Sequence, residues 1–406
     1  MKKLLLAVLT GFAALSLAAC GGSKDKFGFI FLHDEKSTYD KNFIDAAKDV
    51  CKELGVQAVL KTNVPEGEAC YSTAKELAKK GCKGIFADSF GHESFMIQAA
   101  KEYTTVEFAH ATGTNAHTEG LSNFHNAFAS IYEGRYVAGI AAGMKLNEMI
   151  TAGKISASEA VMGYVGAFPY AEVVSGYTSF YLGAKSVCPS VTMKVRYTNS
   201  WYDENAERTT ATTLINDDKC VLISQHADSQ GAPSVCESKE VPNVFYNGEN
   251  KSLKKSYLTS SRINWRPYFR YFIQSTLEGK KMDADWTGTL ENGAVEVFAA
   301  SEIAAEGTQK AMDDAIAALK AGTTKVFNTA NFTVSYFGDA SKGDYTNLNA
   351  TVDATGKVTS YKADVDSDPN YAGDTEVIVG GIFVESEKRS APYFDIRIDG
   401  ITEITA

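Results

Sequence analysis

The chain repeats one pattern of strands and helices, and this repeat limits the possible fold more than any other feature. Each copy has a strand with a glycine after an apolar residue, a strand ending in Thr-Asn, and a strand that begins with a cysteine. The matching positions, offset by about 136 residues, are Gly28 and Gly163, Asn63 and Asn199, and Cys82 and Cys220. Short apolar runs that alternate with helical patterns are typical of buried parallel strands. A long-period repeat of such units predicts an α/β fold of two doubly wound, Rossmann-like lobes joined by a hinge.

The lobe boundaries follow from where the two copies begin and end. We expect the first lobe to comprise 27–146 plus about 262–290, and the second 161–258 plus about 291–406. The last part is rich in Gly, Asn and Asp and predicts a β-rich extension of the second lobe. The helix after Ser130 has a small-residue face, which predicts that it closes the first lobe by packing on its sheet. Residues 147–160 are then the first crossing between the lobes.

The first residues have the form of an export signal. Two lysines precede an uncharged run that ends at Ala19 and is short for a membrane span. The sequence Leu-Ala-Ala-Cys at 17–20 resembles the bacterial lipobox, in which the cysteine is lipidated. We therefore predict a signal peptide at 1–19, a lipid on Cys20 that anchors the chain to the bilayer, and a tether at 20–26. The folded part would lie on the extracytoplasmic face of the cell membrane.

Charge and cysteine content exclude some classes of function. The net charge is −10 and the sequence shows no basic stripe, so we expect no nucleic-acid partner. Six cysteines remain after Cys20, in an exported chain where disulfides are allowed. Two interpretations stay open: the pairs Cys51–Cys82 and Cys188–Cys220, or six buried free thiols. No cysteine spacing predicts a zinc site.

Two other patterns bear on metal binding. His110, His117 and His125 lie on strand and loop segments with no accompanying carboxylate pattern. Aspartates at 364, 366 and 368 alternate as in a calcium loop, but the positions that need Gly and Glu hold Pro369 and Thr375. We predict no metal site and no cofactor.

In the first lobe, the candidate ligand residues follow predicted strands. Ligands of open α/β sheets bind beyond the carboxyl ends of the strands. After the first strand, the polar segment 34–43 leads into a helix predicted over 42–54 and offers Tyr39, Asp40 and Asn42. Alternatively, Asp40 only caps that helix. Ser89 and Phe90 follow the third strand.

The second lobe has an aromatic or hydrogen-bonding side chain after each strand. These candidates are Phe168, Trp201, His226, Asp228 and Asn247. Aromatic walls with a few polar groups suit a flat heteroaromatic ligand, and Trp201 is the candidate for stacking. A helix predicted to begin at Asn264-Trp265 should pack on the first lobe and bring Trp265 to the rim of the cleft.

Several of these segments together resemble one known family. They are the lipobox and, in order, EFAHATGT, YEGRYVAGIAAG, VGAFPYAEVVSGYTSFYLGAKSV, TNSWYDE, ISQHADS and RINWRPYF. Over roughly 27–300 they look like the basic membrane protein (BMP) family, lipid-anchored solute receptors of ABC importers with the type I periplasmic-binding-protein fold. The resemblance implies a monomer that binds a purine nucleoside or base and delivers it to a permease.

The resemblance also bears on single residues. Trp201 matches the stacking aromatic of the family's second lobe, TYDKNF is similar to its first-loop motif, and Asp228 matches the polar position after QHAD. Asn247 stands where relatives often have Asp, which leaves nucleoside, base and other heterocycles open. Two further functions are considered: a sensor of the same fold without an importer, and an extracellular nucleosidase using Asp228 with His226. The second is disfavoured because no GxSxG motif or carboxylate cluster is present.

Overall fold

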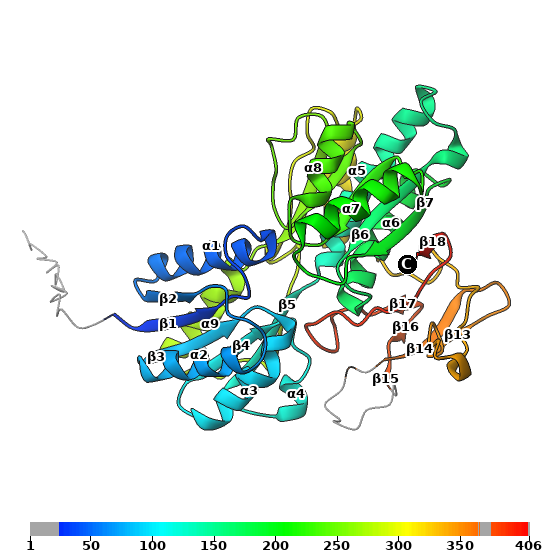
Figure 1. The fold of residues 1–406 in the computed structure, drawn as a ribbon. Coiled ribbons are helices and arrows are strands. Elements are labelled where there is room, and N and C mark those ends of the chain that lie inside the picture. The colour runs from blue at the N-terminus through cyan, green and yellow to red at the C-terminus, as the bar shows by residue number, and fades with distance from the viewer. Residues whose placement is uncertain (1–23, 364, 366–374, 405–406) are drawn as a thin grey trace, which may run out of the picture.

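The predicted α/β fold of two lobes is confirmed in a computed structural model, which describes residues 24–363, 365 and 375–404 (Figure 1). Each lobe is a twisted, mainly parallel sheet covered by helices on both faces. The elements of the first lobe are β1 (Lys26–Ile30), α1 (Thr38–Glu53), β2 (Gln57–Lys61), α2 (Glu68–Lys79), β3 (Cys82–Ala87), the 3-10 turn η1 (Phe90–His92), α3 (Glu93–Glu102), β4 (Glu107–Ala111), α4 (Ala116–Glu119), β5 (Phe124–Ala129), α9 (Arg266–Glu278) and β11 (Asp285–Gly288).

The second lobe repeats this arrangement. Its elements are α5 (Ile131–Thr151), the 3-10 turn η2 (Ala157–Glu159), β6 (Val161–Gly166), α6 (Ala171–Val187), β7 (Thr192–Tyr197), α7 (Glu204–Asn216), β8 (Leu222–His226), α8 (Gly231–Lys239), β9 (Asn243–Tyr246), β10 (Tyr257–Ile263), β12 (Val295–Val297) and α10 (Thr308–Lys320). The sheets have the orders β2-β1-β3-β4-β5-β11 and β18-β7-β6-β8-β9-β10-β12, where β18 (Ile401–Glu403) comes from the end of the chain. The first five strands of each lobe therefore take the same places, as the repeat predicted.

Two pairs of repeated residues have a shared physical role. A Cβ on Gly28 would lie 2.8 Å from Leu77 Cδ1, and one on Gly163 would lie 2.5 Å from Ile223 Cδ1. Both glycines thus let a neighbouring side chain approach the central strand closely. Asn63 and Asn199 each have φ of 56°, in the left-handed region that asparagine tolerates better than most residues. Each turns the chain after the second strand of its lobe.

The position of α5 differs from the prediction. The chain crosses from the first lobe between β5 and α5, not at 147–160, and α5 packs against α6 and β10 of the second lobe. A Cβ on Gly139 would lie 2.0 Å from the main-chain oxygen of Phe180, and one on Gly183 would lie 2.0 Å from that of Tyr136. The small-residue face therefore serves close contact between two helices rather than packing on the first sheet.

The chain crosses between the lobes twice more, from β10 to α9 and from β11 to β12. As expected, α9 packs on the first lobe, where it contacts α1, β3 and β11. The remaining elements after α10 are η3 (Ala340–Lys342), β13 (Ala350–Val352), β14 (Val358–Ala363), β15 (Thr375–Glu376), β16 (Ile378–Val379), β17 (Ile382–Phe383) and β18 (Ile401–Glu403). They form two small sheets, while β18 joins the edge of the second large sheet beside β7. In the described part of the extension, the regular elements other than η3 are short strands.

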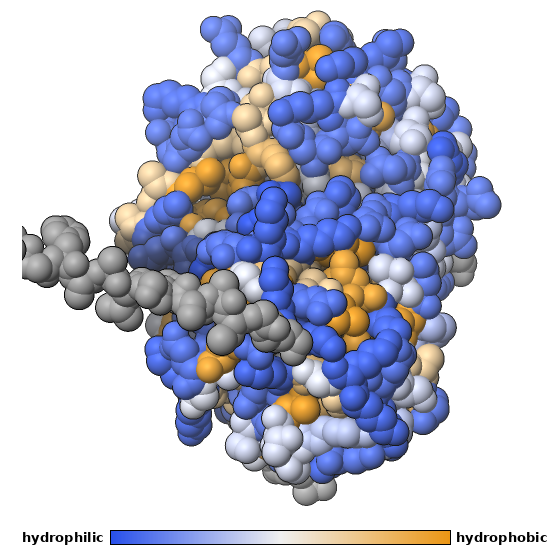
Figure 2. Space-filling view, turned by 90° about the vertical axis from the view of Figure 1, so that its left-hand side faces the viewer, coloured by the Kyte–Doolittle hydropathy of each residue, from blue (hydrophilic) through white to orange (hydrophobic). Residues whose placement is uncertain are grey.

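The face in Figure 2 is mainly hydrophilic, with hydrophobic residues in several smaller areas. None of the helices in the described part of the chain is long and apolar enough to cross a membrane. The predicted signal peptide, Cys20, most of the tether at 20–26 and the aspartates at 364, 366 and 368 lie outside the described residues. All six described cysteines are buried free thiols, which corresponds to the second of the two interpretations of the cysteines.

Candidate functional site

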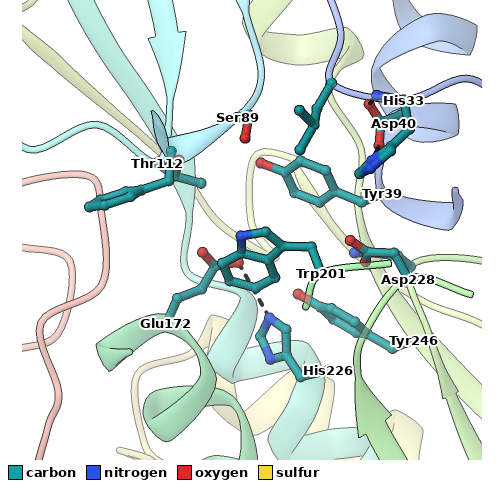
Figure 3. Close-up of a pocket in the computed structure, with 13 residues that line it drawn as sticks. His33, Tyr39, Asp40, Ser89, Thr112, Glu172, Trp201, His226, Asp228 and Tyr246 are labelled. Atoms are coloured by element: carbon teal, nitrogen blue, oxygen red, sulfur yellow. Dashed lines mark hydrogen bonds and ion pairs between the residues drawn. The ribbon is translucent and has the colours of Figure 1, made fainter. Parts of the chain in front are cut away.

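A cleft between the two lobes is lined by residues that follow the carboxyl ends of their strands. About 420 Å³ of space lies between the atoms that surround it, including space open to solvent. The lining residues are Leu32, His33, Tyr39, Asp40, Ser89, Phe90 and Thr112 from the first lobe, and Glu172, Trp201, His226, Asp228, Tyr246 and Asn247 from the second. Figure 3 shows the labelled side chains of the two lobes facing one another across a common space.

The first wall is built by the start of α1. This helix begins at Thr38, earlier than predicted, because the side chain of Ser37 caps it by accepting a hydrogen bond from the Asp40 main-chain nitrogen at 3.2 Å. Asp40 in turn accepts hydrogen bonds from the His33 main-chain nitrogen at 2.7 Å and the Ser37 hydroxyl at 2.6 Å. Burial alone would raise the pKa of Asp40, but the His33 imidazole, 3.4 Å from Oδ2, acts together with these bonds to outweigh burial and lower the pKa. Both oxygens of Asp40 thus already have partners within the wall.

Tyr39 is held in place on the opposite face of the same turn. Its hydroxyl donates to the main-chain oxygen of Asp88 at 2.8 Å, and its ring meets Phe43 edge-on at 4.8 Å. Ser89 donates its hydroxyl proton to Glu66 at 2.6 Å. The hydroxyl protons of Tyr39 and Ser89 are therefore in use, so toward the cleft these oxygens can act as hydrogen-bond acceptors.

Aromatic side chains form the second wall and the mouth. Trp201 is half-buried, and its ring meets that of Phe168 edge-on at 5.3 Å. Phe168 stacks on Tyr170 at 5.0 Å, and Tyr170 lies 6.0 Å from Phe90 of the first lobe. Phe90 and Tyr170 are 49% and 46% exposed. Aromatic rings from both lobes thus meet at the entrance, and Phe168 packs edge-on against Trp201.

Two carboxyl groups lie on opposite sides of the cleft (Figure 3). Asp228 is 5% exposed, and its pKa is raised well above its usual value by burial and by the negative charges of Asp40, Glu207 and Glu172. Glu172 lies in the first turn of α6, with Oε1 3.3 Å from Nε2 of His226. Burial lowers the pKa of His226, so its imidazole is neutral near pH 7 and can donate this bond.

A buried arginine supports the floor of the cleft. Arg135, on α5, donates hydrogen bonds to the Ser224 hydroxyl at 2.8 Å and the Tyr164 hydroxyl at 3.1 Å. Its guanidinium also lies 5.0 Å from the ring centre of Tyr246, which is 4.5 Å from the His226 ring. The cation–π contact and the two hydroxyl partners offset part of the free-energy cost of burying the guanidinium charge. Arg135 thus fixes Tyr246 and, through it, His226.

Hydrogen bonds to main-chain oxygens close the cleft at one side. The main-chain nitrogen of Thr38 donates to the main-chain oxygen of Asp228 at 3.1 Å, and the side-chain Nδ2 of Asn42 donates to the main-chain oxygen of Asn247 at 2.8 Å. Both bonds join the first two turns of α1 to strand ends of the second lobe. We refer to this arrangement, in which the two lobes are in direct contact beside the cleft, as the closed form.

Eight of the eleven predicted ligand residues line this cleft, and three do not. Asn42 is buried in the contact between the lobes. Phe168 is not among the lining residues and packs edge-on against Trp201. The prediction that Trp265 lies at the rim is wrong, because it is 1% exposed and stacks on Phe43 at 4.2 Å in the core of the first lobe.

Five lining residues were not predicted: Leu32, His33, Thr112, Glu172 and Tyr246. Four of them lie at or just after strand ends, the same signal that identified their neighbours. Glu172 could have been found as the acid in the first turn of α6, but an acid there is also expected simply to favour the helix dipole.

The three histidines that were considered as possible metal ligands each have a partner in the first lobe. His110 lies 2.6 Å from the Ser89 oxygen, His117 pairs with Asp285, and His125 lies 3.1 Å from Glu107. Within the described residues, no three His, Cys, Asp or Glu side chains form a group able to hold a metal ion.

Comparisons with known proteins show which family and fold the chain is similar to. Residues 31–323 match the family described as Bmp, ABC transporter substrate-binding protein PnrA-like. A purine-binding protein of Brucella abortus is 32% identical over 80% of this chain and 89% of its own length. A putative ABC transporter glucose-binding protein of Haloferax volcanii is 35% identical, over 52% of this chain and 50% of its own length. A solved ABC transporter solute-binding protein from Conexibacter woesei has a TM-score of 0.61 at 16% identity, over 74% of this chain and 98% of its own, which shows a shared fold.

Proposed function

Because the chain belongs to the PnrA-like family of ABC transporter substrate-binding proteins, we propose that its inter-lobe cleft binds a purine nucleoside or purine base. The observation that carries this proposal is the composition of the cleft. Trp201, Tyr39 and Tyr246 supply flat faces, while the carboxyl groups of Asp228 and Glu172 supply hydrogen-bonding groups at opposite sides. Stacking of a base on an aromatic ring contributes about 1–3 kcal/mol.

The charge of the cleft restricts the ligand further. Among its described lining residues there is no Lys or Arg, whereas Asp40, Glu172 and Asp228 are all present. A phosphate group would meet these carboxyls without a cation to neutralise it. The proposed ligand is therefore uncharged, and nucleotides are expected not to bind.

The proposal is tested by calorimetric titration with inosine, guanosine, adenosine, hypoxanthine, adenine, AMP and glucose. We expect binding of at least one nucleoside or base and none of AMP. Trp201→Ala should weaken purine binding by about 1–3 kcal/mol, whereas Trp286→Phe, which lies outside the cleft and keeps an aromatic ring against Tyr268, should leave the affinity unchanged. Binding of glucose with no binding of any purine would contradict the proposal.

Substrate-binding proteins of ABC transporters act outside the cytoplasm, and we further propose that Cys20 carries the lipid that anchors this one. Replacing Cys20 with Ala should move the protein from the membrane fraction to the soluble exported fraction. A permease is the proposed partner, so a strain lacking it should no longer accumulate the bound purine.

The alternative of a nucleosidase has little support in the geometry of the cleft. His226 Nε2 contacts Glu172, and its ring is fixed beneath the cleft by Tyr246. The known relatives are substrate-binding proteins. A sensor of the same fold would bind ligand identically, and measuring uptake in a strain with Trp201→Ala separates the two functions.

A further inference from the structure

The C-terminal extension contacts both lobes, although the family match ends at residue 323. Its anchor on the second lobe is strong. Strand β18 pairs in parallel with β7, and Glu403 on β18 accepts hydrogen bonds from the hydroxyls of Tyr177 at 2.6 Å and Tyr197 at 2.5 Å. The main chain adds a bond from the Ile404 nitrogen to the Val195 oxygen at 2.8 Å.

The anchor on the first lobe is smaller and lies on the edge strand β11. Asp285 accepts hydrogen bonds from the main-chain nitrogen of Ser390 at 2.9 Å and from its hydroxyl at 2.6 Å. Thr287, two residues further on, donates to the main-chain oxygen of Ser386 at 3.2 Å. Ser390 is fully buried, so its polar groups depend on these partners.

The chain passes from one lobe to the other between neighbouring residues. Glu385 is buried, and Ser175 on α6 of the second lobe acts on the pKa of its carboxyl, while Ser386 contacts Thr287 of the first lobe. This segment also lies beside the hinge. Phe394 of the extension stacks on Phe327 at 4.1 Å, and Phe327 in turn lies 5.1 Å from Tyr132. Tyr132 is in the first turn of α5, just after the chain first crosses between the lobes.

We propose that residues 384–404 form a strap that links the lobes beside the three covalent crossings and limits how far the cleft opens. When the lobes separate, β11 moves relative to α6, and the strap must either release one anchor or hold the lobes together. The strand pairing at β18 is the stronger anchor, so release occurs at Asp285 and Thr287. The strap therefore favours the closed form and slows the exit of ligand.

The test compares the unaltered protein with Asp285→Ala/Thr287→Val, which removes the side-chain contacts to the strap. His117→Ala is the matched control, because it breaks the pairing of Asp285 within the first lobe and leaves the strap anchored. Small-angle X-ray scattering of the ligand-free proteins measures the opening. We expect a larger radius of gyration for the double variant only.

Release of bound inosine gives a second readout, expected to be about tenfold faster in the double variant, equivalent to about 1.4 kcal/mol. A radius of gyration of the double variant equal to that of the unaltered protein would overturn the proposal of a strap. An equal increase of the radius of gyration in His117→Ala would also overturn it. Should the double variant not fold, Thr287→Val alone provides the same comparison. Since the scattering needs no ligand, failure of inosine to bind would count against the purine assignment and not against the strap.

Discussion

The hydrogen bond from Asn42 to Asn247 gives a measurable prediction about closure. It joins α1 to the end of β9 across the cleft at 2.8 Å, and both residues are buried in the closed form. Asn42→Ala removes the Nδ2 donor, so the main-chain oxygen of Asn247 has no hydrogen-bond donor from Asn42 whenever the lobes are closed. A buried acceptor without its partner costs about 1–3 kcal/mol. In an open form the same oxygen can bond to water, so the cost applies to closure.

We therefore expect Asn42→Ala to weaken purine binding by about 1–2 kcal/mol, roughly 5- to 30-fold. The measurement is calorimetric titration with the tightest purine of the panel above, together with the release rate by stopped flow. Thr38→Val is the control. It removes the hydrogen bond from the Thr38 hydroxyl to the main-chain oxygen of Asp228 at 3.3 Å but keeps the bond from the Thr38 main-chain nitrogen to the same oxygen at 3.1 Å. The affinity for the purine should therefore change by less than about threefold. Equal affinity of Asn42→Ala and the unaltered protein would refute this account of closure.

Three further predictions concern packing, pH and fluorescence. Gly139→Ala should lower the free energy of unfolding by about 3 kcal/mol, measured in urea, because its Cβ would lie 2.0 Å from the main-chain oxygen of Phe180. Burial raises the pKa of Glu207 to about 7, so its ionisation disfavours the folded state and stability should fall as the pH rises from about 4.5 through 7. In urea titrations across this range, Glu207→Gln should show a shallower fall. Trp201→Phe should abolish the change in tryptophan fluorescence on ligand binding, whereas Trp286→Phe should retain it; the reverse result would exclude Trp201 as the stacking residue.

The repeat in the sequence predicted the architecture because the repeated residues meet the same local backbone and packing requirements in both lobes. Gly28, Gly163, Asn63 and Asn199 each meet a backbone or packing demand that recurs in both lobes. The same sequence did not identify the partner of α5. A face of small residues permits close approach to a helix or to a sheet equally, and the choice of α6 depends on glycines more than thirty residues away.

The candidate site was predictable where polar residues follow strand ends, as at Ser89, His226 and Asp228. It was not predictable where burial depends on distant residues. Trp265 begins an amphipathic helix and has the appearance of a rim residue in the sequence, but the ring of Phe43 covers it. Asn42 likewise has the character of a ligand-binding amide, and only the position of Asn247 shows that it joins the lobes instead.

The central claim is that this cleft holds a purine, and the small molecule that copurifies with the protein tests it most directly. The purified protein would be denatured and the released compound identified by mass spectrometry, with Asp228→Ala purified in parallel. The account predicts a purine nucleoside or base at about one molecule per protein, and much less from the variant. A sugar, peptide or nucleotide at the same ratio would contradict it.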